Sequence, residues 1–136
     1  MTTTKTLFVA FSHNLTASQI EDAKISLGIT NIVMLRDVDS ELQKQISAIP
    51  ATATTHEVKQ LATKVVDYAV QYGADYALLT GEPTLTVHMN IIAYNRDGIE
   101  CVMSTTERGL DSEILQPDGS VRKVQNFKHV QWRNVF

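Results

Sequence analysis

The chain has 136 residues, of which 43% are hydrophobic and 20% charged, with one cysteine and a formal net charge of −3. This length predicts a single domain with a sizeable core, and the lone Cys101 excludes an internal disulfide framework and is typical of a reducing, cytoplasmic setting. The charge gives no indication of bulk binding to DNA or other nucleic acid, and no apolar stretch approaches the roughly 18 to 20 residues of a membrane span.

The first predicted strand is the apolar run from Leu7 to Phe11, and three polar residues follow it at positions 12–14. A helix should begin directly afterwards, because residues 16–19 (TASQ) fit a capping box in which a hydroxyl and a carboxamide satisfy opposed backbone N–H groups. Gly28 is placed to end this helix in a left-handed conformation.

The rest of the chain repeats the same order of helix, glycine, short linker and apolar strand. Gly73 and Gly98 follow their predicted helices as Gly28 follows the first. In chain order we expect a strand at Ile32–Leu35, a short helix between Asp39 and Ala48, a helix that begins with a second capping box at Thr54–Glu57, a strand at Tyr76–Leu79, a helix from about Thr84 to Asn95, and a strand at Glu100–Met103.

These strands are short and nearly all apolar, which is typical of parallel strands covered on both faces. Strands that alternate with helices form right-handed βαβ units, so residues 1–110 predict an α/β, Rossmann-like core with an open, mainly parallel sheet and helices on both faces. Residues 111–136 differ: a Pro-Asp-Gly turn predicts a β-hairpin from about Ser112 to Phe127, followed by a short tail. The whole of 1–136 is interpreted as one domain.

Ligands of open parallel sheets bind at the carboxyl ends of the strands. Four polar loops are expected there: Ser12-His13-Asn14, Arg36-Asp37, Thr80 to Thr84, and Ser104-Thr105-Thr106-Glu107-Arg108. Hydroxyls, amides, a glycine turn and an arginine beside helix N-termini favour a phosphate-bearing ligand. No GxGxxG, P-loop, CxxC or helical His/Glu zinc spacing is present, so the sequence predicts neither a dinucleotide cofactor nor a metal site.

The positions of the four histidines in the sequence favour a functional role to different degrees. His13 lies at a strand tip in a polar loop, where a functional role is favoured over a core position, whereas His129 fits either a site role or simple packing at the end of the hairpin. His56 and His88 are interpreted as surface residues, and Cys101 as a core residue. Trp132 is interpreted as a packing or interface aromatic rather than an exposed stacking platform.

Four segments, FSHNLTASQIEDAKISLG, LLTGEPTLTVHM, STTER and DGSVRKVQNFKHVQWR, occur in an order and spacing that resembles a small CRISPR-associated family, the stand-alone, CARF-like ring nucleases of type III systems. The resemblance runs over nearly the whole chain and is strongest at its two ends. One departure is plain: members tend to carry Gly-Asp-aromatic-Gly-Ala after the third strand, where this chain has Gly81-Glu82-Pro83-Thr84-Leu85.

The resemblance implies a homodimer that binds a cyclic oligoadenylate, most simply cyclic tetra-adenylate, and cuts it without metal by attack of an adenosine 2′-hydroxyl on its own 3′-phosphate. It implies that His13 acts as acid or base, that Arg108 stabilises charge, and that Ser12 positions the phosphate together with Asn14. Further ligand contacts are expected from a set of loop residues: Gly81, Glu82, Thr84, Thr105, Thr106 and His129.

Two other classes stay open. The fold could serve a non-catalytic sensor or sponge for the same messenger, or an unrelated nucleotide-processing enzyme on a Rossmann scaffold that prefers mononucleotides to rings.

Overall fold

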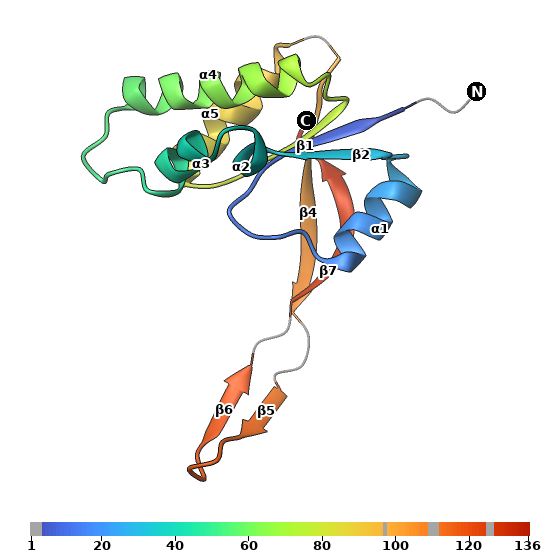
Figure 1. Cartoon of the computed structure of the whole chain (residues 1–136), viewed down its shortest axis with the longest axis vertical. Coiled ribbons are helices and arrows are strands. Elements are labelled where there is room, and N and C mark those ends of the chain that lie inside the picture. Colours follow the sequence, from blue (N-terminus) through green and yellow to red (C-terminus); the bar gives the residue numbers. More distant parts are fainter. Residues whose placement is uncertain (1–3, 97, 109–111, 125–126) are drawn as a thin grey trace.

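A computed structural model describes residues 4–96, 98–108, 112–124 and 127–136 (Figure 1). Its elements, in chain order, are β1 (Thr6–Ala10), α1 (Ala17–Ser26), β2 (Asn31–Met34), α2 (Leu35–Val38), α3 (Ser40–Ser47), α4 (Thr55–Gln71), β3 (Tyr76–Leu79), α5 (Pro83–Tyr94), β4 (Glu100–Arg108), β5 (Ser112–Leu115), β6 (Val121–Val124) and β7 (Phe127–Asn134). No helix of the described part of the chain is long and apolar enough to cross a membrane.

The central sheet has the strand order β2-β1-β3-β4-β7. The first four strands are parallel, and β7 runs antiparallel to β4 at the edge. Strand β1 lies between two neighbours, with Phe8 opposite Val33 of β2 and Ala77 of β3, and all five of its residues are buried. Because both faces of this strand contact apolar cores, its residues do not alternate between polar and apolar, which explains the continuous apolar run in the sequence.

The two faces of the sheet carry separate cores. Phe8 and Ala10 pack with the helices from α2 to α5, while Leu7 and Val9 pack on the opposite face with α1 and Trp132. Figure 1 shows α1 on one side of the sheet and the other helices on the other side. The chain is therefore an α/β domain with a mixed, mostly parallel sheet and helices on both faces, an arrangement compatible with the predicted Rossmann-like fold.

The predicted helix ends are confirmed. The Thr16 side chain accepts a hydrogen bond from the Gln19 N–H while the Gln19 side chain accepts one from the Thr16 N–H, so the first capping box is complete. At the second, Thr54 accepts from the Glu57 N–H, but the return bond from the Thr54 N–H to the Glu57 side chain is not formed, so this box is only half complete. Gly28 and Gly73 follow their helices with φ of 70° and 67°, values that only glycine adopts without strain.

Two predicted loops are wrong because regular structure continues through them. Strand β2 ends at Met34, and Arg36 and Asp37 belong to the short helix α2 that follows without a gap. The segment 104–108 is not a loop either, because β4 extends to Arg108 and pairs with β7 over its whole polar half. Threonines are as common in extended, half-exposed strands as in ligand loops, so the hydroxyl residues of this segment wrongly predicted a loop.

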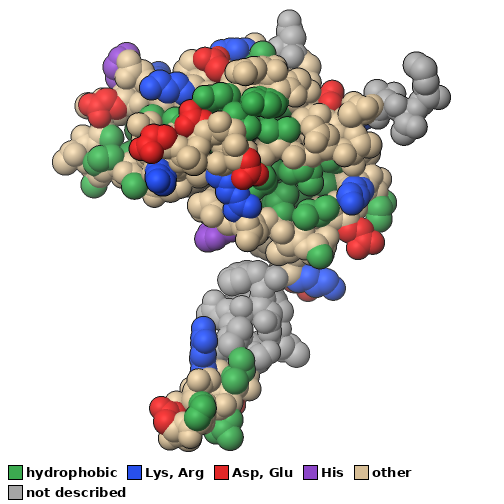
Figure 2. Space-filling model, viewed as in Figure 1, with side chains coloured by type: hydrophobic (Ala, Val, Ile, Leu, Met, Phe, Trp, Pro, Cys, Tyr) green, Lys and Arg blue, Asp and Glu red, His purple; other side chains and the backbone are tan. Residues whose placement is uncertain are grey.

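The predicted C-terminal tail is a strand, β7, that returns along β4 and closes the edge of the sheet. The predicted hairpin exists as β5 and β6, joined by a turn in which Gly119 has a φ of 87°. This hairpin projects from the body as an arm (Figure 1), and apolar side chains lie on its surface, namely Ile114, Leu115 and Val121 (Figure 2).

Candidate functional site

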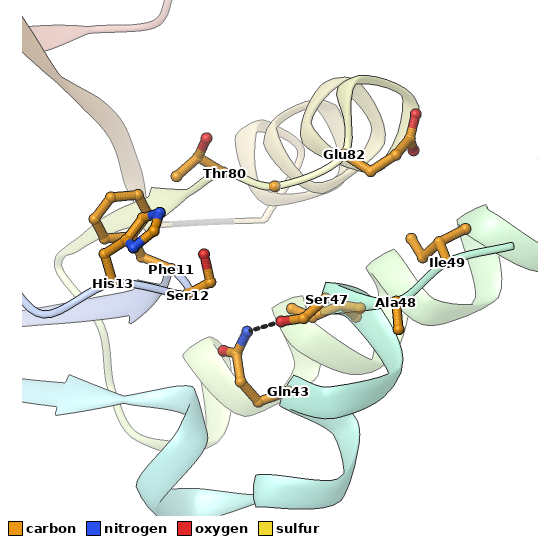
Figure 3. A pocket seen from close by; sticks show the side chains of 11 residues that line it. Phe11, Ser12, His13, Gln43, Ser47, Ala48, Ile49, Thr80 and Glu82 are labelled. Carbon is orange, nitrogen blue, oxygen red and sulfur yellow. Dashed lines mark hydrogen bonds between the residues drawn. The ribbon is translucent and has the colours of Figure 1, made fainter. Parts of the chain in front are cut away.

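A pocket of about 460 Å³ lies at the carboxyl ends of β1 and β3. The chain order reverses between these two strands, because β2 follows on one side of β1 and β3 and β4 follow on the other. Open α/β sheets bind ligands at such a switch point. The lining comes from three segments: the loop after β1, the loop after β3 and the end of α3 (Figure 3). Its residues are Phe11, Ser12, His13, Gln43, Ile46, Ser47, Ala48, Ile49, Thr80, Gly81 and Glu82.

The loop after β1 places Ser12 and His13 at the pocket, as the sequence predicted. Both side chains are exposed, and the His13 ring meets the Phe11 ring edge-on, with centroids 5.2 Å apart and an interplanar angle of 73°. Phe11 packs against the core on the α1 face and so provides a fixed base for the imidazole. His13 is thus held at the pocket while its ring nitrogens stay accessible.

Glu82 caps α5, so the backbone N–H groups at the start of this helix are not free to bind a ligand. Its two carboxylate oxygens accept hydrogen bonds from the N–H groups of Thr84 and Leu85, each at 3.0 Å, and these bonds hold the pKa of Glu82 below its ordinary range. Pro83 occupies the first turn, where its missing N–H costs nothing. The Gly81 N–H donates to Thr86 Oγ1 at 2.9 Å. The backbone donors expected of Gly81 and Thr84 are therefore already bound within the chain.

The end of α3 is the part of the pocket that the sequence did not reveal. Gln43 Nε2 donates to Ser47 Oγ at 2.9 Å, while Gln43 Oε1 is buried and has no hydrogen-bond partner among the described residues. Ile46, Ala48 and Ile49 add an apolar wall. The sequence predicted only a short helix between Asp39 and Ala48, because nothing in a sequence shows which side of the sheet a helix will cover.

Other predicted site residues lie outside this pocket. Asn14 is exposed and does not line it, and Thr84 lines a smaller neighbouring cavity of about 180 Å³. Thr105 Oγ1 is hydrogen-bonded to the backbone of Gln131 in the β4–β7 pair, and Thr106 is exposed on the same strand. The side chain of Arg108 lies outside the described residues, so its role stays a prediction.

His129 lies on the other face of the sheet, in a chain of hydrogen bonds between α1, β4 and β7. Gln19 Nε2 donates to Ser104 Oγ at 3.1 Å, and Ser104 Oγ lies 2.6 Å from His129 Nδ1. His129 Nε2 lies 2.7 Å from Asp22 Oδ2. Because the Asp22 carboxylate can only accept, the Nε2–H of His129 donates to it, and in the neutral imidazole Nδ1 is then the acceptor for the Ser104 hydroxyl proton.

This chain of bonds joins two predicted residues, Ser104 and His129, to two that sequence reasoning missed, Gln19 and Asp22. The His129 side chain is only 4% exposed and packs beside Trp132, whose indole N–H donates to the Gln19 carbonyl at 3.1 Å. Asp22 sits one turn after Gln19 on the helix, a spacing that could have suggested one polar face. The arrangement ties α1 to the antiparallel edge of the sheet.

Asp22 gives the chain of bonds a pH dependence. Its carboxylate accepts hydrogen bonds from the Ser26 hydroxyl and from His129, and these lower the pKa of Asp22 from its ordinary 3.8. The folded protein therefore binds a proton at the Asp22 carboxyl group less tightly than the unfolded chain does. Its stabilisation is complete above about pH 5 and is lost as the pH falls through the lowered pKa.

We therefore expect the free energy of unfolding in urea to fall between about pH 5 and pH 3, and the Asp22→Asn variant to show a shallower fall over that range. Asp37→Asn, at an exposed position on α2, is the matched control and should keep the wild-type slope. Identical slopes for wild type and Asp22→Asn would show that this carboxylate does not take part in acid unfolding.

Neither a metal centre nor a reactive thiol emerges from the described residues. No group of three or more His, Cys, Asp or Glu that could hold an ion occurs in the described part of the chain. Cys101 is buried in the core, as predicted, and burial raises the pKa of its thiol to about 11, so little thiolate exists near neutral pH.

The fold and the pocket define a class: an α/β domain with a pocket at the switch point of its sheet. Residues 5–133 match the family described as "Uncharacterized protein MJ1673 family", and the chain belongs to this family. It is similar to the protein of that description from Methanocaldococcus jannaschii, with 28% identity over 129 residues that cover 93% of this chain and 94% of the relative. No solved structure matches.

Proposed function

We propose that this protein is a CARF-like ring nuclease, which binds a cyclic oligoadenylate and cuts it, and so ends a type III CRISPR signal. The observation that carries the proposal is the pocket at the switch point, where the loop after β1 brings Ser12 and His13 beside the loop of Gly81 and Glu82. These four residues are separated by up to 70 positions in the sequence, yet they line one cavity, as the resemblance implies for a nucleotide site.

In the proposed reaction the adenosine 2′-hydroxyl attacks the adjacent 3′-phosphate in line with the departing 5′-oxygen. The 2′-hydroxyl loses its proton, the P–O5′ bond breaks, and the 5′-oxygen takes up a proton, which leaves a 2′,3′-cyclic phosphate. Since the substrate supplies the nucleophile, the protein needs to hold an in-line conformation and to move protons. His13 is the exposed imidazole at the pocket and the candidate for that transfer, with Ser12 beside it.

A ring of several nucleotides exceeds one pocket of about 460 Å³, so the proposal includes a second copy of the chain that offers the same loops across a two-fold axis. The sequence also suggested a dimer through three apolar residues without an assured place in a single core, namely Met89, Trp132 and Phe136. Met89 and Trp132 are buried within the protomer, whereas Phe136 is exposed. Support comes from α5, whose sequence PTLTVHMNIIAY contains no charged residue and whose exposed side chains include Val87, Ile91 and Tyr94.

We expect light scattering to show a dimer at micromolar concentration in the presence of cyclic tetra-adenylate. Ile91→Arg should weaken it, because a buried unpaired charge at an interface is costly. Ile25→Arg, at an exposed position on α1, is the matched control and should leave the mass unchanged. A monomer in the presence of the ring would contradict the shared groove.

The experiment that tests the function is an incubation of the protein with cyclic tetra-adenylate and cyclic hexa-adenylate, with the products resolved by chromatography. Linear products with 2′,3′-cyclic phosphate ends, formed equally with and without EDTA, support the ring nuclease. A bound but intact ring indicates the sensor or sponge instead. Binding of mononucleotides without preference for a ring indicates a different nucleotide-processing enzyme.

A further inference from the structure

The charges of the pocket do not suit a phosphate group. Among the eleven lining residues none is Lys or Arg, and the single acidic one is Glu82. Its carboxylate already occupies the Thr84 and Leu85 N–H groups at the start of α5. An anion at that helix terminus would have to displace the carboxylate and remain close to its negative charge, which is unfavourable.

The mixed apolar and polar lining of the pocket suits an uncharged ring better than an anion. Ile46, Ala48 and Ile49 at the end of α3 provide an apolar wall, and the Phe11 ring, which His13 meets edge-on from the loop, provides an aromatic one. Figure 3 shows the loop of Thr80 and Glu82 on one side of the opening and the end of α3 on the other. Pockets of this kind bind ligands by apolar contact and take their specificity from a few polar groups.

One polar atom on this wall has an unmet hydrogen bond. Gln43 donates its amide N–H to Ser47, but its Oε1 is buried without a partner among the described residues. A buried acceptor left unpaired destabilises the protein, and it marks a place where an incoming N–H group would be favoured. Gln43 is itself one of the residues that line the cavity.

We propose that the pocket binds the adenine base of one nucleotide, with the exocyclic amine directed at Gln43, and that the phosphates of the ring lie outside the pocket. The inference rests on the proposed function, since it takes the ligand to be an oligoadenylate. It replaces the expectation that these loops cradle a phosphate. It also places the ribose, which follows the base outward, near His13 at the mouth.

Calorimetric titration with adenosine, which carries no phosphate, tests the proposal. Adenosine should bind with an affinity that does not change between about 50 mM and 500 mM salt, because there is no charge to screen. Inosine, which has a carbonyl in place of the amine, should bind about tenfold more weakly, as should adenosine to Gln43→Leu. Gln45→Leu, an exposed glutamine on the same helix outside this pocket, should bind adenosine as wild type does.

Three outcomes overturn the inference: no adenosine binding at millimolar concentration, binding of ribose 5-phosphate or inorganic phosphate in preference to adenosine, or equal adenosine affinity for Gln43→Leu and wild type. The two proposals fail separately. Adenosine bound as expected but a ring left intact contradicts ring cleavage and keeps the base pocket. A ring that is cut, with unchanged ring affinity in Gln43→Leu, keeps the nuclease and removes the base pocket.

Discussion

Replacing His13 with alanine should lower the single-turnover rate of ring cleavage by at least about a hundredfold while ring affinity stays within a few-fold of wild type. A residue that moves protons contributes chiefly in the transition state, where general acid–base catalysis supplies roughly 10²- to 10⁴-fold. His13 is exposed and makes its ring contact with Phe11, so its removal takes little from the folded structure. Rapid quenching of enzyme in excess over labelled ring measures the rate.

His56→Ala is the matched control, because His56 is exposed in the first turn of α4 and does not line the pocket. It should cut at the wild-type rate. If His13→Ala also cuts near that rate, the loop only holds the ligand and catalysis rests on positioning. His129 is not a substitute for His13 in this protomer's pocket, because its buried imidazole lies on the opposite face of the sheet.

Replacing His129 with alanine should destabilise the fold by about 3 kcal/mol, since it leaves the Ser104 hydroxyl and the Asp22 carboxylate without their partner and opens a gap beside Trp132. Urea unfolding at neutral pH measures the change. His129→Gln, which keeps a side-chain hydrogen-bonding group of similar length, should recover part of the loss.

His56→Ala is the control for this variant, because His56 lies exposed in the first turn of α4, and its substitution should change stability by no more than about 0.5 kcal/mol. An equally small effect for His129→Ala would show that the hydrogen-bond chain between α1, β4 and β7 does not hold the edge of the sheet.

Most of the parallel half of the fold could be predicted from the sequence, because residues within each βαβ unit mark where its helix begins and ends. Thr16 and Thr54 mark helix starts, Gly28 and Gly73 mark helix ends, and the strand at Tyr76–Leu79 has the predicted bounds. These are local signals, and local hydrogen bonding and backbone sterics determine them.

The antiparallel edge could not be predicted, because it depends on partners distant in sequence. The segment 104–108 reads as a polar loop until β7 pairs with it, and the segment 128–134 reads as a tail until β4 does. Trp132 was correctly expected to pack, but Met89 was not placed in a core. Helix α5 has no charged residue to mark its exposed face, so the burial of Met89 depends on where its neighbours lie.

Some residues of the candidate site could likewise be predicted from the sequence and others could not. Ser12, His13, Gly81 and Glu82 lie at strand ends, and topology alone brings strand ends together at one edge of a sheet. Gln43 comes from a helix whose position over that edge no sequence pattern shows. The capping role of Glu82 was also not foreseen, although an acid before a proline at a helix start fits it.

The central claim is that the ring's own 2′-hydroxyl is the nucleophile at this pocket. The most direct test compares cyclic tetra-adenylate with its 2′-O-methyl analogue, both incubated with the protein in EDTA and analysed by mass spectrometry. We predict that the natural ring opens to products with 2′,3′-cyclic phosphate ends, while the analogue binds and stays intact. Cleavage of the analogue, or cleavage of the natural ring only when magnesium or manganese is restored, would contradict it.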